Sequence, residues 1–133
     1  MDLSAFATTL TSSEDWPTLM AADAEVQDAF YAGLAEIAAK QKVVYTTMIS
    51  AAVGELALVE VENSDDVQKV KDVFQARIAY QVGDEKNPGG AWYPDSIDGW
   101  KNNSRIVSNG NYVMLVVGDA CDEAVEAFNA LFA

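Results

Sequence analysis

The chain has 133 residues, half of them apolar, and its 8 basic and 21 acidic residues give a net charge of −13. A chain of this length can bury the core of one domain without disulfides, and its apolar content excludes a disordered polypeptide. Nucleic acid and anionic membrane surfaces are negatively charged, so both are disfavoured as partners. We therefore expect a single acidic domain, residues 1–133, that does not bind nucleic acid.

Two residue types limit the chemistry, because histidine is absent and cysteine occurs once, at Cys121. The lack of histidine excludes Ser-His-Asp and Cys-His catalysis and histidine-ligated zinc. One cysteine permits neither an intrachain disulfide nor a thiolate metal site, so we expect no metal and no cofactor. No apolar run approaches the roughly 20 residues of a membrane span, and the start, MDLSAFATTL, lacks the features of a secretory signal.

The N-terminal part, residues 1–42, is predicted to be helical. A short helix is expected over residues 2–10, and a second helix from Asp23 to residues 40–42. In the second helix Val26, Phe30, Leu34 and Ile37 recur at helical spacing, although Gly33 weakens its middle.

The central unit combines two strands and a long helix. Residues 43–50 are rich in β-branched side chains, and residues 56–62 alternate between two faces, so both segments read as strands. The short connection between them favours an antiparallel hairpin. Residues 63–66 then supply capping oxygens for a helix over residues 67–81, whose apolar stripe needs a sheet to cover it.

The C-terminal part begins with a polar loop, residues 83–90, and a short helix starting at Pro94. Asn109-Gly110 separates two β-prone segments, residues 105–108 and 111–117, and predicts a second hairpin. Asp119 is expected to cap a final helix, whose buried face comprises Val125, Phe128, Leu131 and Phe132.

Strands that arrive as two hairpins, without regular alternation of strand and helix, predict an α+β fold. We expect a mainly antiparallel sheet of about four strands, with the long helix and the C-terminal helix packed on one face. Residues 43–133 would form this sheet-and-helix core.

Arg77 is the first candidate site residue, because it lies at the edge of the buried stripe of the long helix. In the structural interpretation it pairs with Glu55 or Glu60, and Tyr93 caps the pair. In the functional interpretation Arg77 and Gln81, one turn apart on the same helix face, frame with Tyr93 a polar pocket for an anionic group.

The aromatic residues Trp92, Tyr93 and Trp100 form a second candidate site beside the Gly-rich loop. Exposed aromatic faces stack on sugar rings or on peptide side chains. The alternative is that these side chains plug one end of the core.

Paired carboxylates are the third candidate, since glycoside hydrolysis uses two of them. With 21 acidic residues, chance pairs such as Glu60 with Glu62 or Asp95 with Asp98 are expected to be solvated. The spacing of Asp95, Asp98 and Gly99 does not match a calcium loop. We therefore assign no catalytic and no metal-binding residue.

Several short pieces also carry a family likeness, which extends roughly over residues 43–132. The pieces are Met48-Ile49, residues 54–59, Val67, Val70-Lys71, Arg77, Gln81, Tyr93-Pro94 and residues 110–113. Their order resembles a bacterial domain-of-unknown-function family of short lipoproteins from Gram-positive, clostridia-like anaerobes. The resemblance implies an extracytoplasmic, lipid-anchored domain at the cell surface. The sequence differs from that family in starting without a leader or a lipid-bearing cysteine, so a cytoplasmic location is the alternative.

We therefore expect a non-enzymatic extracytoplasmic domain that binds a small ligand, a glycan or a protein partner. The competing expectation is a carboxylate-dependent hydrolase of cell-wall or carbohydrate substrates.

Overall fold

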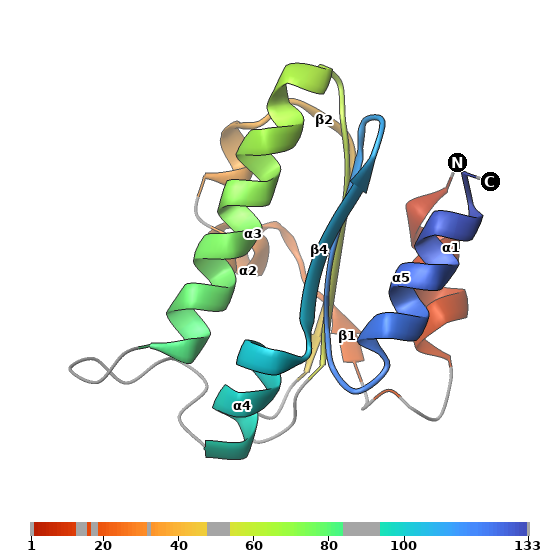
Figure 1. Ribbon diagram of the computed structural model, residues 1–133. Helices are drawn as coiled ribbons and strands as arrows, with labels where there is room; N and C mark the ends of the chain where they lie inside the picture. The colour runs from red at the N-terminus through yellow and green to blue at the C-terminus, as the bar shows by residue number, and fades with distance from the viewer. Residues whose placement is uncertain are drawn as a thin grey trace.

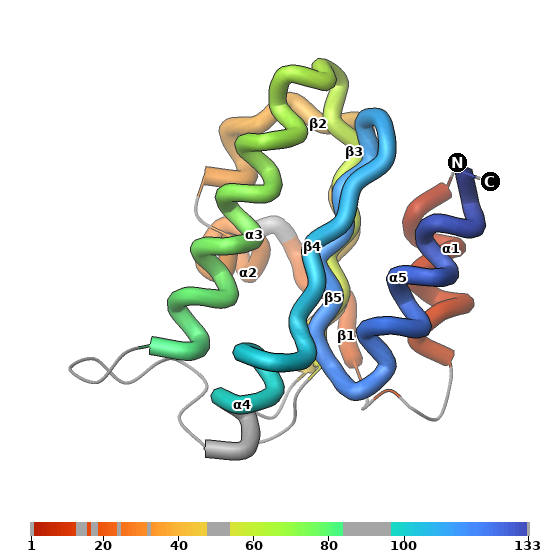
Figure 2. Tube along the Cα trace, viewed as in Figure 1, coloured from red at the N-terminus to blue at the C-terminus, as the bar shows by residue number. Residues whose placement is uncertain are grey.

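The computed structural model describes residues 2–12, 16, 19–31, 33–47, 54–83 and 94–132. Figure 1 shows a sheet with helices on both of its faces, and Figure 2 follows the same path as a tube. In chain order the elements are α1 (Leu3–Thr11), β1 (Leu19–Ala21), α2 (Ala24–Phe30), the helical turn η1 (Leu34–Glu36), β2 (Ala39–Thr47), β3 (Glu55–Val61), the helical turn η2 (Ser64–Asp66), α3 (Val67–Val82), α4 (Pro94–Asn102), β4 (Ser104–Asn109), β5 (Tyr112–Val117) and α5 (Cys121–Ala130).

The sheet confirms the predicted α+β fold class. Its strands follow the order β1-β2-β3-β5-β4, and every neighbouring pair is antiparallel. Both predicted hairpins form: β2 pairs with β3, and β4 pairs with β5 through the turn at Gly110, where φ is +56°. The two hairpins join where β3 pairs with β5, for example at Leu58 and Met114.

The sheet has five strands rather than about four, because Leu19–Ala21 adds β1 at the edge beside β2. This strand and the start of β2 at Ala39 both lie in residues 1–42, so the prediction that this N-terminal part is helical is wrong for these two segments. The predicted helix from Asp23 stops at Phe30. Gly33 adopts φ +92°, which breaks the helical path and leads the chain into β2.

The expectation that the long and C-terminal helices share one face is wrong. Helices α2, α3 and α4 cover one face, and α1 and α5 cover the other (Figure 1). The reason is that β3 and β5 are apolar on both faces, so each face needs a cover. Alternate residues of these strands enter two separate cores: Ala57, Val59, Val61, Val113, Leu115 and Val117 on the α3 face, and Leu56, Leu58, Met114 and Val116 on the α5 face.

The final helix, α5, is present, but Asp119 does not cap it. Ala120 occupies the cap position without a side-chain hydrogen bond, and Asp119 instead accepts a hydrogen bond of 3.4 Å from Asn103. Of the predicted buried face, Phe128 is fully buried, whereas Leu131 is 39% exposed. In the part of the chain that the structure describes, no helix has the length and apolar character needed to span a bilayer.

Candidate functional site

Arg77 lies on the buried face of α3 because of its position in the helical repeat. Val70, Phe74 and Arg77 follow one another at intervals of four and three residues, so all three face the sheet. The Arg77 side chain is only 5% exposed. A guanidinium at that depth requires a partner, because an unpaired buried charge is strongly unfavourable.

Glu55, the first residue of β3, is that partner, and it is only 1% exposed. Arg77 donates from Nε to Oε2 and from Nη2 to Oε1, each at 3.0 Å. Thr46 donates from its hydroxyl to Oε1 at 2.9 Å, and the Tyr31 hydroxyl donates to Oε2. These four hydrogen bonds occupy every acceptor position of the carboxylate and compensate its burial.

Two pKa shifts follow from this arrangement. Burial raises the pKa of the Tyr31 phenol well above its ordinary value, and the negative charge of Glu55 raises it further. Tyr31 therefore stays neutral and remains a hydrogen-bond donor. Burial alone would lower the pKa of Arg77, but the hydrogen bonds and charge of Glu55 outweigh burial and raise it. Arg77 therefore stays charged.

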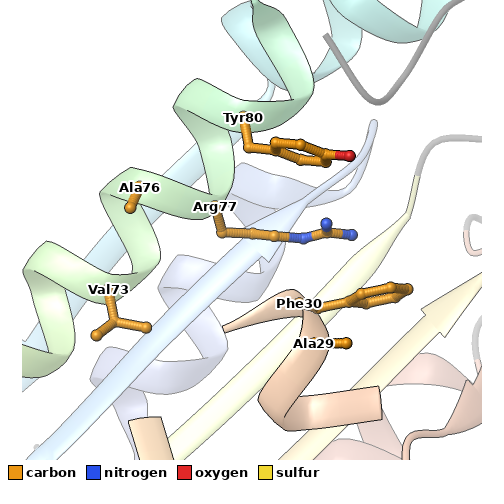
Figure 3. A pocket seen from close by; sticks show the side chains of 6 residues that line it. All are labelled: Ala29, Phe30, Val73, Ala76, Arg77 and Tyr80. Atoms are coloured by element: carbon orange, nitrogen blue, oxygen red, sulfur yellow. The ribbon is translucent and has the colours of Figure 1, made fainter. Parts of the chain in front are cut away.

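Aromatic rings surround the guanidinium of Arg77. Its central carbon lies 4.3 Å from the ring centre of Phe30, 5.1 Å from that of Trp100 and 5.8 Å from that of Tyr31. These distances suit cation–π attraction. In Figure 3 the guanidinium lies between the rings of Phe30 and Tyr80.

A cavity of about 280 Å³ opens between α2 and α3 at this point. Its apolar lining, shown in Figure 3, comes from Ala29, Phe30, Val73 and Ala76, and Arg77 and Tyr80 supply the polar groups. Val73 also borders a second cavity of about 350 Å³, toward the start of α3. We call the first of these the Arg77 cavity.

The structural interpretation of Arg77 is confirmed with Glu55 as its partner. Glu60 instead accepts a hydrogen bond of 2.9 Å from Gln41, which lowers the pKa of Glu60. The hydroxyl of Tyr31 also donates to Glu55, and the capping role predicted for Tyr93 lies outside the described residues. The amide oxygen of Gln81 is buried and has no hydrogen-bond donor among the described residues.

The predicted aromatic site is only partly described. Trp92 and Tyr93 lie outside the described residues. Trp100, in α4, is 5% exposed and packs in the core on the α3 face. For Trp100 alone, this burial agrees with the alternative interpretation that the aromatic residues fill one end of the core.

Sequence reasoning missed the aromatic walls of the Arg77 cavity. Phe30 and Tyr80 read as members of apolar helix stripes, yet they are 37% and 66% exposed. The signal that could have found them was the pair Phe30-Tyr31 just before Gly33, where a helix with a glycine in its middle is prone to end. No three side chains of the metal-binding types converge among the described residues.

Comparison with known proteins gives one family match. No curated protein and no solved structure matches the chain. A family model matches residues 15–118, a span that contains both Glu55 and Arg77 and the whole lining of the Arg77 cavity. The predicted resemblance to a domain-of-unknown-function family is thereby confirmed. The chain belongs to the family described as domain of unknown function DUF4358.

Proposed function

We propose that this domain is a non-enzymatic binding module that holds a small ligand in the Arg77 cavity. The observation that carries the proposal is the position of the exposed apolar side chains. The large hydrophobic side chains exposed in the described part of the chain are Met20, Phe30, Tyr80 and Leu131, and two of these four border this one cavity. Exposed apolar groups gathered at a concave site are typical of ligand pockets.

The volume of the cavity and the fixed position of Arg77 beside it favour a small ligand that binds in one orientation. Its volume of about 280 Å³ lies at the lower end of the range of roughly 300–1,000 Å³ that is usual for small-molecule sites. The polar group beside the cavity, Arg77, is fixed by two hydrogen bonds to the buried Glu55. A group fixed in this way loses little conformational entropy on binding.

The carboxylates of Glu55 and Glu60 do not support the competing hydrolase. Glu55 accepts four hydrogen bonds and is paired with Arg77, so it has no position left for a substrate. The pKa of Glu60 is lowered by its hydrogen bond from Gln41. A general acid in glycoside hydrolysis needs a raised pKa.

We also propose that the domain acts outside the membrane, anchored by lipid at the cell surface. The support is the resemblance of its short motifs to short bacterial lipoproteins. The test is to grow the native host with labelled palmitate and to treat intact cells with protease. Label in the protein and cleavage from outside are expected. An unlabelled protein that is cleaved only after lysis would contradict this location.

The binding proposal is tested by a thermal-shift screen of small acids, neutral aromatic compounds, sugars and short peptides. A ligand at 100 times its dissociation constant stabilises the folded state by roughly 2.7 kcal/mol. The expected result is a shift in the wild type that Tyr80→Ala removes. Leu131→Ala is the matched control, because Leu131 is also an exposed apolar side chain but does not line the cavity. A shift that survives Tyr80→Ala, or no shift with any compound, would contradict the proposal.

A further inference from the structure

We propose that the ligand of the Arg77 cavity is a flat monocarboxylate, held by the outer edge of the Arg77 guanidinium and stacked against Phe30 and Tyr80. This inference rests on the proposed binding function and adds the chemical class of the ligand.

The first step concerns the two edges of the guanidinium. A guanidinium offers five N–H groups, and two of its edges can each bind a carboxylate through a pair of hydrogen bonds. The inner edge, formed by Nε and Nη2, is used by Glu55. The two hydrogen bonds to Glu55 leave the outer edge, formed by Nη1 and the second hydrogen of Nη2, unused by that carboxylate.

The second step concerns access to that outer edge. The only buried side-chain polar atom without a partner in the described part of the chain is Oε1 of Gln81. The nitrogen Nη1 does not belong to that set, and the Arg77 side chain lines the cavity. In the proposed complex the outer N–H groups face the cavity, where a carboxylate replaces water with two charge-assisted hydrogen bonds.

The third step concerns shape. In Figure 3 the rings of Phe30 and Tyr80 lie on opposite sides of the guanidinium. A carboxylate that bonds to the outer edge lies in the plane of the guanidinium and so continues into the space bordered by these rings. A flat group attached to the carboxylate can stack there, whereas a puckered ring of the same size makes poorer contact with aromatic faces.

The fourth step concerns charge. Glu55 neutralises Arg77, and the chain as a whole carries −13. The negative charge of the chain repels anions, and this repulsion is strongest for phosphorylated or otherwise multiply charged ligands. The cavity has too little positive charge to offset it. A single carboxylate carries the least charge that still uses both hydrogen bonds of the outer edge.

The test uses three probes, titrated separately into the intact chain and followed by backbone amide shifts in nuclear magnetic resonance spectra. Benzoate is flat and charged, cyclohexanecarboxylate is charged but puckered, and benzyl alcohol is flat but neutral. We expect benzoate to bind at least tenfold more tightly than either of the others, with shifts concentrated in α2 and α3. Tyr80→Ala should weaken benzoate binding at least tenfold, whereas Tyr80→Phe, which keeps the ring, and Leu131→Ala should leave it within twofold.

The outcomes separate this inference from the proposed function. If benzyl alcohol binds as tightly as benzoate, the carboxylate assignment is overturned. If cyclohexanecarboxylate matches benzoate, the flat shape is overturned. If benzoate does not bind while another compound of the thermal-shift screen binds and depends on Tyr80, the inference fails and the binding function stands. If neither benzoate nor any screened compound binds, both fail.

Discussion

The two faces of the sheet are built from the same strands but differ in what they bury. The α5 face is filled by apolar side chains, including Leu58, Met114 and Phe128. The α3 face contains an apolar core and also the three buried polar side chains of the described residues, Thr46, Glu55 and Arg77. Burying an ion pair is often no more stabilising than burying apolar residues of similar volume. A contribution to stability alone therefore does not explain the buried pair, and the binding role proposed for the α3 face, which also carries the cavity, offers a second reason for it.

The largest loss of stability is expected when one partner of the buried ion pair on the α3 face is removed. Glu55→Ala leaves the guanidinium of Arg77 buried without its counter-charge, which is expected to cost about 3–5 kcal/mol of unfolding free energy. Urea denaturation followed by circular dichroism measures this loss. Glu60→Ala is the control, because Glu60 is partly exposed and should change stability by less than about 1 kcal/mol. Equal losses for the two variants would show that the polar cluster is not the special feature of this face.

A comparable truncation on the α5 face should act by a different mechanism. Met114→Ala removes a fully buried side chain and leaves a cavity in the apolar core, at an expected cost of about 2–5 kcal/mol. Because this core lies across the sheet from the Arg77 cavity, the folded variant should keep its affinity for any ligand of that cavity. Denaturation gives the stability, and titration at a temperature where the variant is folded gives the affinity. A loss of affinity in a folded variant would contradict the division of roles between the faces.

Removing only the Tyr31 hydroxyl should have a smaller effect. Tyr31→Phe keeps the ring that packs edge-on against Phe74 at 5.7 Å, but it leaves one acceptor position of Glu55 empty. The expected loss is about 1.5–3 kcal/mol, since the hydrogen bond is made to a charged group. Tyr112→Phe is the control on the other face, where the phenol of Tyr112 is only half-buried.

The same variant should alter the pH dependence of stability. The pKa of Tyr31 is raised in the folded state above its ordinary value of about 10. The stability contributed by the phenol is therefore complete below pH 10 and is lost as the pH rises toward the folded-state pKa. Wild type should lose more stability than Tyr31→Phe between about pH 9 and pH 11. Parallel curves would show that Tyr31 does not titrate as its surroundings predict.

Local sequence signals predicted the pairing of the strands but not the layers of the fold. Asn109-Gly110 specifies a tight turn by its own backbone preferences, so the second hairpin could be predicted without knowing the rest of the molecule. The side of the sheet on which a helix packs depends on the path of the connecting segments and on the whole set of apolar faces. The strand Glu55–Val61 reads as half-buried, because Glu60 and Glu62 suggest a polar face. In the structure Leu56 and Leu58 on that face are completely covered by α1 and α5.

Some features of the candidate site could likewise be predicted from the sequence, and others could not. The pairing of Arg77 with a glutamate of the neighbouring strand, Glu55 or Glu60, could be predicted, because a buried charge needs a partner, but the choice of Glu55 could not. The contribution of Tyr31 could not, because it depends on the helix ending at Phe30 and not near residue 40. The cavity arises from the packing of α2 against α3, and Phe30 and Tyr80 belong to it only through that packing. Periodicity assigned both rings to the core, since it does not distinguish a buried stripe from the rim of a pocket.

The smallest expected effect on stability gives the sharpest test of the role of the α3 face. Tyr80 is 66% exposed, so Tyr80→Ala should change the unfolding free energy by no more than about 0.5 kcal/mol. The same substitution removes one wall of the Arg77 cavity and should abolish binding there. Denaturation and ligand titration on one preparation measure both quantities. A loss of stability above about 2 kcal/mol would show that Tyr80 is structural. The exposed aromatic ring would then no longer distinguish the α3 face from the α5 face as a binding surface.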